Sequence, residues 1–437
     1  MKISSPRGTS DILPCQIAAW QQLETIAKKI FKAYGYSEIR TPLFEEVGLF
    51  KRSLGETTEV VNKQLLGVGA LQESPVSAES QGPAFSLRPE GTAPVVRAYN
   101  QYDLGREEFL SKLFYMGPMF RGERPQKGRL RQFHQIGAEA IGRGANHPLL
   151  DAELIALSVG LLASFGLNDF KLKINSLGSA QDKQNFAVWL REALKGKIDH
   201  LSDETRAQYE RNVFRLLDSK EQACKDVINS LDIGTRHLSE SGMQYFEQVR
   251  KGLDQLGVTY EVSPHLVRGL DYYTHTVFEI SYAGLGAQDA LGAGGRYNGL
   301  IEQLGGGDRR FPQQVGAMGF ALGMERILLA LEAQGKLLVS RCSLDVFVVA
   351  GKVELEEAVF ALVHELRQAG MAADMDFGGG RAFKKQFEQA NKLGARYVVI
   401  LGEEEIANHT VAVKNMTTGE QVSLTRTSII DHIKAAL

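Results

Sequence analysis

Cysteine is scarce in this 437-residue chain, and the three that occur, Cys15, Cys224 and Cys342, lie far apart. Such spacing gives neither a disulfide framework nor a thiolate metal site, and it fits a reducing compartment. An excess of one charge is also lacking, since 50 Lys and Arg are matched by 52 Asp and Glu and the net charge is -2. This balance excludes a globally basic nucleic-acid coat, although it leaves room for local basic patches.

Long apolar runs are missing as well. The longest uncharged stretch of interest, 154–168, is shorter than the roughly 20 residues that a bilayer-spanning helix requires. No apolar segment follows Lys2, so no signal peptide is expected. The chain also lacks a G-x-x-x-x-G-K-[ST] loop and any H-E-x-x-H spacing among its nine histidines, which argues against a Walker-type ATPase and a histidine-built metal site. We therefore expect a cytoplasmic protein without a bound structural metal and without a membrane partner.

Apolar residues (43%) and charged residues (23%) are in the globular range, and the length suggests two to four domains. The sequence predicts a large domain over 1–335, in which a block at about 181–252 reads as an inserted helical module. Residues 316–332 are expected to form the helix that closes this domain. A linker is predicted at 336–343, and residues 344–437 alternate strand and helix like a compact α/β domain with parallel strands.

A charged segment at 120–131 contains five basic residues and one acidic residue, with Gly and Pro to prevent a helix. It follows a strand signal and resembles a hairpin with a charged tip. Arginines at such a bend suit phosphate groups, because guanidinium binds phosphate through two parallel hydrogen bonds. A solvated hairpin that protects a sheet edge is an equally good interpretation of the composition alone.

Three other segments place polar residues next to glycine, where backbone can approach a ligand. Taken singly, 87–93 and 268–273 are better interpreted as capped turns, and Thr92 would then start a helix. The run 291–299 suggests a dinucleotide site, but Tyr297 occupies the position where G-x-G-x-x-G needs its third glycine. A Rossmann site is therefore rejected.

Taken together and in this order, the segments resemble a class II aminoacyl-tRNA synthetase and, within that class, the histidyl-tRNA synthetase family. The helix leading into 39–42 is similar to motif 1, the homodimer element, while 120–133 is similar to motif 2 and 319–326 to motif 3. Segments 266–273 and 292–299 resemble two that are peculiar to the histidine family. The resemblance covers nearly the whole chain. It implies an α+β catalytic domain with a mainly antiparallel sheet, an inserted helical module and a C-terminal α/β anticodon-binding domain.

The resemblance also implies a reaction. L-Histidine would be activated with ATP to histidyl-adenylate and pyrophosphate, and histidine would then pass to the 3′-terminal ribose of tRNA(His). ATP would arrive as a complex with Mg2+, which binds through oxygens. The family likeness further implies a homodimer.

Site residues follow from the same resemblance. Negative charge grows at the α-phosphorus and on pyrophosphate, so preorganised cations are the economical catalyst. The implied catalytic residues are Arg121, which would bind the α-phosphate and the substrate carboxylate, and Arg268, which would reach the α-phosphate from the opposite side. The implied ATP-binding residues are Arg121, Glu123, Phe133 and Arg326. The implied histidine-binding residues are Glu90, Gly91, Thr92, Arg121, Gln135, Glu139, Arg268, Tyr272 and Tyr273. Of these, Glu90, Thr92 and Gln135 fit the amine, and Glu139, Tyr272 and Tyr273 fit the imidazole.

The tRNA side is less visible in the sequence. Residues 341–437 carry 11 Lys and Arg against 13 Asp and Glu, so a local patch such as Arg381, Lys384 and Lys385 would have to supply phosphate contacts. The inserted helical block resembles the region that contacts the tRNA acceptor arm. One departure from the family is the Gly/Ser-rich insertion at 67–83, which is expected to be a loop where the family continues through an aromatic-containing strand.

Two alternatives are weighed against this interpretation. A non-catalytic paralogue, the regulatory subunit of ATP phosphoribosyltransferase, resembles the catalytic core but lacks the C-terminal domain and the arginine-bearing segment. Here Arg268 and the domain over 344–437 are both present. A sister class II enzyme for proline or threonine shares the C-terminal domain, but the segment 268–273 argues against it.

Overall fold

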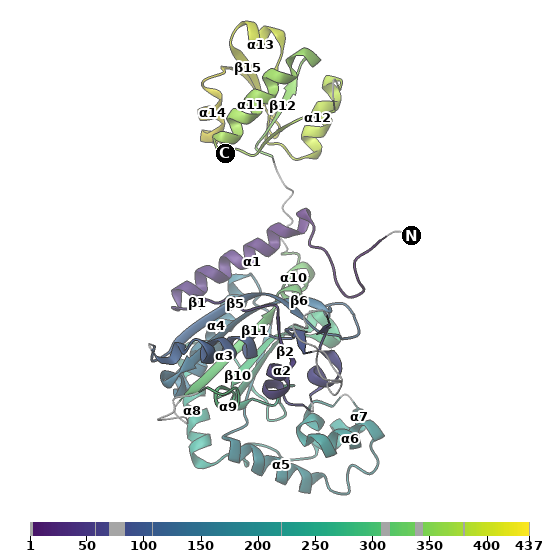
Figure 1. The fold of residues 1–437 in the computed structure, drawn as a ribbon, viewed down its shortest axis with the longest axis vertical. Helices are drawn as coiled ribbons and strands as arrows, with labels where there is room; N and C mark the ends of the chain where they lie inside the picture. Colours follow the sequence, from purple (N-terminus) through teal and green to yellow (C-terminus); the bar gives the residue numbers. More distant parts are fainter. Residues whose placement is uncertain are drawn as a thin grey trace. The chain divides into compact units, whose positions relative to one another are not determined.

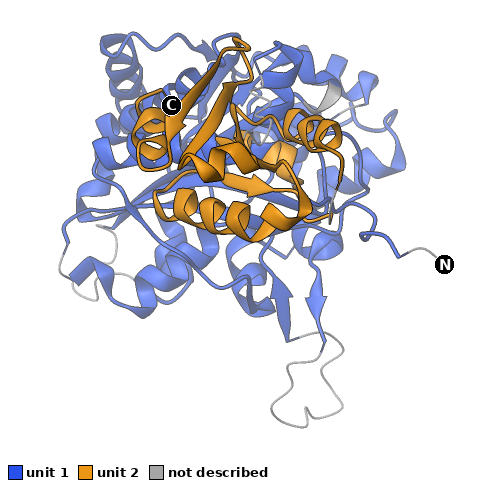
Figure 2. Cartoon of the chain, turned by 90° about the horizontal axis from the view of Figure 1, so that it is seen from above, with its two compact units in different colours: residues 1–11, 20–337 blue, residues 12–19, 338–437 orange. Residues whose placement is uncertain are grey.

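The computed structural model describes residues 3–56, 58–69, 84–106, 108–219, 221–306, 315–336, 344–378 and 381–436. The chain folds into two compact units, one made of residues 1–11 and 20–337 and the other of residues 12–19 and 338–437 (Figure 2). Within the described ranges, no helix is both long enough and apolar enough to cross a membrane.

An eight-stranded sheet forms the centre of the first unit (Figure 1). Its order is β1-β5-β6-β11-β10-β9-β7-β8, and every pair of neighbours is antiparallel except the two outermost, β1 with β5 and β7 with β8. The strands are β1 (Ser37–Glu38), β5 (Ser111–Phe120), β6 (Gln132–Gly142), β11 (Gly316–Gly323), β10 (Ala290–Arg296), β9 (Thr274–Ser281), β7 (Lys171–Ser176) and β8 (Glu261–Val262). The mainly antiparallel sheet implied by the resemblance is confirmed.

Strand β11 shows that one prediction was wrong, because residues 316–332 are not one continuous helix. Gly316–Gly323 is a central strand, and the helix α10 (Met324–Ala333) begins only after it. The small residues of β11 allow it to lie between β6 and β10 with both faces covered. A Cβ on Gly319, for example, would overlap the carboxylate of Glu139 on β6. A strand buried on both faces loses the alternation of polar and apolar residues, so its pattern resembles that of a buried helix.

Helices and a smaller sheet surround the large one. The uncharged stretch noted in the sequence belongs mostly to α4 (Pro148–Ser164), whose Leu154, Leu157 and Leu161 are fully buried. Helix α1 (Pro14–Ala33) contains residues of both units, because the division falls between residues 19 and 20. The other helices are α2 (Val47–Leu54), α3 (Thr92–Gln101) and α9 (Gly299–Gln303), and the short helical turns are η1 (Val60–Gln64), η2 (Leu104–Arg106), η3 (Arg143–Asn146) and η5 (Ala283–Gln288). The smaller sheet has the order β2-β4-β3, made of β2 (Phe44–Glu46), β4 (Phe85–Leu87) and β3 (Gly67–Val68). Of the loop predicted over 67–83, residues 67–68 form β3, and residues 70–83 lie outside the described part.

A helical module is inserted between β7 and β8, as the resemblance implied (Figure 1). It contains α5 (Ala180–Leu194), α6 (Asp203–Arg211), η4 (Val213–Asp218), α7 (Gln222–Asn229) and α8 (Glu240–Gln255). Phe186, Leu190, Leu216 and Ile228 belong to a hydrophobic cluster of its own. The module therefore keeps its shape through its own core and meets the large sheet at specific contacts.

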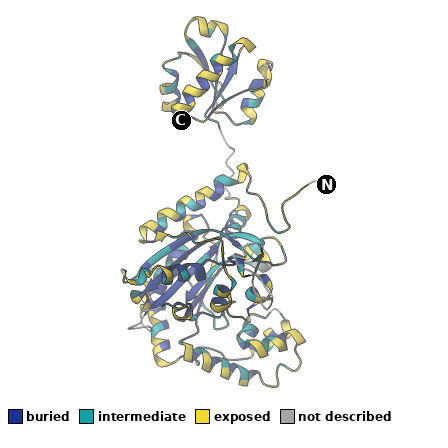
Figure 3. Ribbon diagram, in the orientation of Figure 1, coloured by how far each residue is buried: buried dark blue, intermediate teal, exposed yellow. Residues whose placement is uncertain are grey.

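The second unit is a five-stranded sheet of order β13-β12-β14-β15-β16. Its elements are β12 (Val346–Ala350), η7 (Val353–Leu355), α11 (Glu356–Gln368), β13 (Ala373–Met375), α12 (Phe383–Lys392), β14 (Tyr397–Leu401), α13 (Glu403–Ala407), β15 (Thr410–Asn415), β16 (Gln421–Thr425) and α14 (Ile429–Ala436). Val346 and Val348 pack with α11 and α14, while Phe347 and Val349 pack with α12, so β12 is buried on both faces, whereas the edge strand β16 is mostly exposed (Figure 3). The prediction of parallel strands holds for β13, β12 and β14 but was wrong for β15 and β16, which form an antiparallel hairpin.

Candidate active site

A polar cavity of about 290 Å³ opens over the middle of the large sheet. Ten of the residues predicted from the sequence line it: Glu90, Thr92, Arg121, Glu123, Phe133, Gln135, Arg268, Tyr272, Tyr273 and Arg326. These residues come from the α3 turn, the β5–β6 hairpin, the loop before β9 and the start of α10, so the fold assembles positions separated by more than two hundred residues. Two predicted residues are not on the wall. Gly91 packs against the ring of Tyr115, where a Cβ would overlap the ring, and Glu139 lies fully buried in β6.

The β5–β6 hairpin carries the arginine-rich segment. Residues Arg121 to Arg131 connect the two antiparallel strands, so the predicted hairpin with a charged tip is confirmed. The Arg121 Nε donates to the carbonyl of Pro89 at 2.9 Å, and its guanidinium lies 5.1 Å from the centre of the Phe133 ring. Glu123 is almost fully buried and forms an ion pair with Arg129. Stacking on Phe133 and the bond to Pro89 hold the Arg121 head against the cavity wall, because both restrict its rotamers.

The turn before α3 presents a buried carboxylate. Glu90 accepts hydrogen bonds from the backbone N–H groups of Thr92 (2.7 Å) and Ala93 (2.9 Å), which are otherwise unpaired at a helix start. Thr92 is the first residue of α3, as the sequence predicted. Burial raises the pKa of Glu90, although these two backbone donors and the charge of Arg121 oppose that shift. The turn thus offers a fixed carboxylate to a cationic group in the cavity.

Glu139 on β6 contacts Thr92 but does not itself line the cavity. Its Oε1 accepts from the Thr92 hydroxyl at 2.7 Å, and its Oε2 accepts from the hydroxyl of Tyr297. Burial raises the pKa of Glu139 to about 8, against the lowering effect of the hydrogen bonds from Tyr297 and Thr92. Gly319 makes room for the carboxylate on the neighbouring strand. Sequence reasoning selected Glu139 but not Tyr297, which it used only to reject a dinucleotide site.

The loop before β9 brings Arg268, Tyr272 and Tyr273 to the cavity. Arg268 Nη1 forms an ion pair at 2.6 Å with Oε2 of Glu279, a residue of β9. Its Nε is buried and has no hydrogen-bond partner among the described residues. A buried N–H without a partner carries a free-energy penalty. An anionic or carbonyl oxygen in the cavity that accepted a hydrogen bond from this N–H would remove the penalty and be bound more tightly. The two tyrosine rings lie 4.5 Å apart between their centres.

The start of α10 closes the cavity. Arg326 donates from Nε to the carbonyl of Gly128 (2.9 Å) and from Nη1 to that of Ala290 (2.6 Å), so it joins the hairpin tip to β10. Glu325 accepts from both the backbone N–H and Nδ1 of His134 at about 2.9 Å. The Glu325–His134 pair could not be predicted from the sequence, since partners almost two hundred residues apart leave no local pattern.

Positive charge is concentrated around the cavity. Burial lowers the pKa of Arg121, and the neighbouring charges of Arg129 and Arg268 lower it further, while Glu90 raises it. Burial likewise lowers the pKa of Arg326, followed by the effect of Arg129 and Arg121. Arginine stays protonated in spite of such shifts, so these four guanidinium groups form a field that favours a polyanion. Within the described ranges, no group of three or more His, Cys, Asp or Glu side chains is arranged to hold a metal ion.

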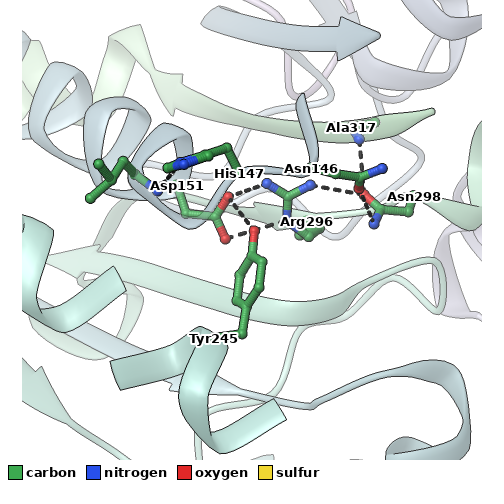
Figure 4. A network of polar contacts seen from close by, with 8 residues as sticks. Asn146, His147, Asp151, Tyr245, Arg296, Asn298 and Ala317 are labelled. Carbon is green, nitrogen blue, oxygen red and sulfur yellow. Dashed lines mark hydrogen bonds and ion pairs between the residues drawn. The ribbon is translucent and has the colours of Figure 1, made fainter. Parts of the chain in front are cut away.

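A buried polar network supports the end of β10 (Figure 4). Arg296 is 1% exposed and forms an ion pair with Asp151 of α4, which is 0% exposed. The hydroxyl of Tyr245 on α8 donates to Asp151 Oδ1 at 3.3 Å, and Arg296 Nη1 donates to Asn298 Oδ1 at 3.0 Å. The network fixes β10 one residue before Tyr297. Sequence reasoning missed it, because a charge inside an apolar helix such as α4 indicates burial with a partner but does not identify that partner.

The chain is similar to known proteins in both sequence and structure. Residues 8–327 match the family model described as Histidyl-tRNA synthetase, and residues 345–436 match the one described as Anticodon binding domain. The chain is 42% identical to a protein of Halothermothrix orenii named Histidine--tRNA ligase, over 99% of both chains. It is also 42% identical to the Geobacillus sp. protein of the same name, over 100% of both. Among solved structures, apo histidyl-tRNA synthetase of S. aureus matches with a TM-score of 0.79 and 35% identity, over 99% of this chain and 100% of that one.

Proposed function

The chain belongs to the histidyl-tRNA synthetase family and catalyses the ligation of histidine to its tRNA, and we propose that the cavity over the large sheet is where histidine is activated. One observation carries this proposal. Arg121 and Arg268, from segments far apart in the chain, both line the cavity, and the buried Arg268 Nε has no hydrogen-bond partner among the residues that the structure describes. In the activation step the histidine carboxylate attacks the α-phosphorus of ATP and pyrophosphate leaves. Fixed guanidinium groups stabilise the charge that develops on the phosphate oxygens.

We assign the ATP-binding role to Arg121, Glu123, Phe133 and Arg326. The ring of Phe133 offers an apolar face on which adenine can stack, and the buried Glu123 carboxylate can accept a hydrogen bond from the adenine amine. Arg326 at present donates to two backbone carbonyls and would have to share its donors with the γ-phosphate. Mg2+ would enter as part of the ATP substrate, neutralising phosphate charge through oxygen ligands.

We assign the histidine amine to Glu90, Thr92 and Gln135, beside Gly91. Glu90 supplies a carboxylate, and the Gln135 Oε1 is buried without a hydrogen-bond partner in the described part of the chain, so it is an acceptor suited to an ammonium group. We assign the imidazole to Glu139, Tyr272 and Tyr273. A pocket that hydrogen-bonds both ring nitrogens rejects other amino acids strongly, because they leave its buried polar groups unpaired.

The partners are proposed from the family model of the second unit and from local sequence. The tRNA anticodon would bind the second unit, whose matching family model is described as an anticodon-binding domain. Arg381, Lys384 and Lys385 are exposed there and could contact phosphates, although Arg381 also lies 3.4 Å from Asp376. We further propose a homodimer, on the likeness of residues 39–42 to motif 1, and a cytoplasmic location, since tRNA is charged there.

The regulatory-paralogue alternative is disfavoured. The relatives named Histidine--tRNA ligase match over the full chain, including the C-terminal domain that such paralogues lack. Arg268 is present and lines the cavity. The first test is exchange of labelled pyrophosphate into ATP, without tRNA, against all twenty amino acids.

We expect exchange with histidine alone. Exchange with a different amino acid would contradict the assigned histidine pocket, and no exchange from folded protein would contradict the activity. The variant Arg268→Ala is expected to lose at least about a hundredfold of kcat while retaining its fold, as removal of a single preorganised donor does elsewhere. Near-normal exchange by this variant would contradict the role assigned to Arg268.

A further inference from the structure

The loop that carries Arg268, Tyr272 and Tyr273 is held from the inserted helical module. Lys183 on α5 donates from Nζ to the backbone carbonyls of Asp271 (2.8 Å) and Tyr273 (2.9 Å). The Asp271 carbonyl belongs to the peptide before Tyr272, and the Tyr273 carbonyl belongs to the peptide after Tyr273, so one ammonium group restrains the backbone at both ends of this tyrosine pair. Bonds from a charged donor are stronger than neutral ones, so this contact fixes the loop more firmly than a neutral side chain would.

Two further contacts from the module reach the same loop through η4. Arg215 Nη2 donates to the carbonyl of Gly269 at 2.7 Å, and Asn212 Nδ2 donates to Asp271 Oδ1 at 3.1 Å. Asn212 also caps η4, since its Oδ1 accepts from the backbone N–H of Phe214 at 3.1 Å. Together with Lys183, these donors contact three residues of the segment 268–273.

The module can act as a support because it is itself held in place. Asp182, next to Lys183, accepts from the backbone N–H of Ser179 (2.9 Å) and from both the N–H and hydroxyl of Ser239 (3.0 Å each). One carboxylate therefore ties the first turn of α5 to the first turn of α8. At the other side, α8 is joined to α4 by the Tyr245–Asp151 hydrogen bond.

Lys183 has an environment unlike that of a surface lysine. It lies in the first turn of α5, a place that favours acidic side chains, and it points away from solvent toward backbone carbonyls. Burial lowers its pKa, and the charge of Asp271 opposes that effect. Both carbonyl partners of this partly buried lysine belong to the loop that carries Arg268, Tyr272 and Tyr273.

We propose that Lys183, supported by Arg215 and Asn212, is a positioning residue for histidine activation: the inserted module sets the loop that places Arg268 and Tyr273 in the cavity. The proposal rests on the proposed function, since the loop is assigned there to histidine and to the α-phosphate. It makes the module part of the amino-acid site even when no tRNA is bound. ATP binding through Arg121 and Phe133 does not depend on this support, because those residues are held by the β5–β6 hairpin.

The test is pyrophosphate exchange without tRNA, with kcat and the two KM values determined separately and active sites counted by adenylate burst. Lys183→Met removes the ammonium and keeps the apolar stem, whereas Lys183→Arg keeps a charged donor. Lys197→Met, an exposed lysine of the same module, is the matched control. Arg215→Met tests the second contact at a less buried position, in case Lys183→Met folds poorly.

For Lys183→Met we expect kcat/KM for histidine to fall by roughly ten- to a hundredfold, because KM for histidine rises and kcat falls. KM for ATP should stay within about twofold of the parent value. Lys183→Arg should recover most of the loss, Arg215→Met should show a smaller effect of the same kind, and Lys197→Met should match the parent. The inference is overturned if Lys183→Met and Arg215→Met leave KM for histidine unchanged, including the case in which only the number of active sites falls. Absence of exchange in the parent protein would instead contradict the proposed function.

Discussion

Replacing Glu139 by glutamine should stabilise the protein and inactivate it at the same time. Glu139 is 0% exposed, and burial raises its pKa from the ordinary value of 4.5 to about 8. Both carboxylate oxygens accept from hydroxyls, those of Thr92 and Tyr297. Glutamine has the same shape, and a hydroxyl can accept from its amide N–H as well as donate to its oxygen, so the packing is preserved.

The sign of the pH effect follows from proton linkage. Because the folded state holds the Glu139 proton more tightly than the unfolded chain, the folded state loses stability as pH rises from about 4.5 to about 8. Across that window the free energy of unfolding of the parent should fall relative to Glu139→Gln by about 1.4 kcal/mol per pH unit, reaching at most about 5 kcal/mol. Above pH 8 the difference should level off.

The assay is urea unfolding of parent and variant at several pH values between 5 and 9, followed by tryptophan fluorescence. Both tryptophans, Trp20 and Trp189, belong to the first unit, so the signal reports on the part that contains Glu139. Glu192→Gln, an exposed carboxyl on α5, is the control for losing a charge in water. A difference that stays constant from pH 5 to 8, or that grows in favour of the parent, would refute the reasoning. In parallel, histidine-dependent exchange by Glu139→Gln should drop by about a hundredfold or more, since an amide replaces the carboxyl group that we assign to the imidazole.

Two further substitutions test the packing that holds the site. Gly319→Ala should destabilise the protein by roughly 1–3 kcal/mol and impair exchange, because the new Cβ overlaps the Glu139 carboxylate. Gly323→Ala on the same strand is the control, since its Cβ meets only atoms at 3.7 Å or more. The two variants are compared by urea unfolding and by exchange. Asp151→Asn should lower the free energy of unfolding in urea by about 3–5 kcal/mol, since it leaves Arg296 buried without a countercharge. A decrease of less than about 1 kcal/mol would show that the ion pair is not needed for stability. Tyr245→Phe removes only one neutral donor from the same carboxylate and should cost about 1 kcal/mol.

The order of the motifs was enough to identify the family and most of the cavity wall. Arg121, Arg268 and Arg326 could be selected before any fold was known, because the motifs that carry them resemble the family when taken together and in order. Taken singly, the segment 268–273 was better interpreted as a capped turn. The helix start at Thr92 and the β5–β6 hairpin were also predictable, since turn and cap residues act on their immediate neighbours.

The sequence pattern failed where burial removed periodicity. Gly316–Gly323 was interpreted as helix because a strand covered on both faces carries no alternation, and only its pairing with β6 and β10 decides its state. The hairpin β15–β16 was missed for a related reason: the α/β alternation before it predicts parallel neighbours, while a turn of five residues at 416–420 allows only an antiparallel return.

The sequence by itself thus determined the family, the reaction and the chemistry of the side chains on the cavity wall, because these depend on residue types in a fixed order. The tertiary structure alone decided which groups hold those side chains. Glu139 meets Tyr297, Arg296 meets Asp151, and Lys183 meets the carbonyls around Tyr272 through contacts between elements distant in the chain. Such pairings arise from the packing of strands and helices in three dimensions, and spacing along the sequence carries no record of them.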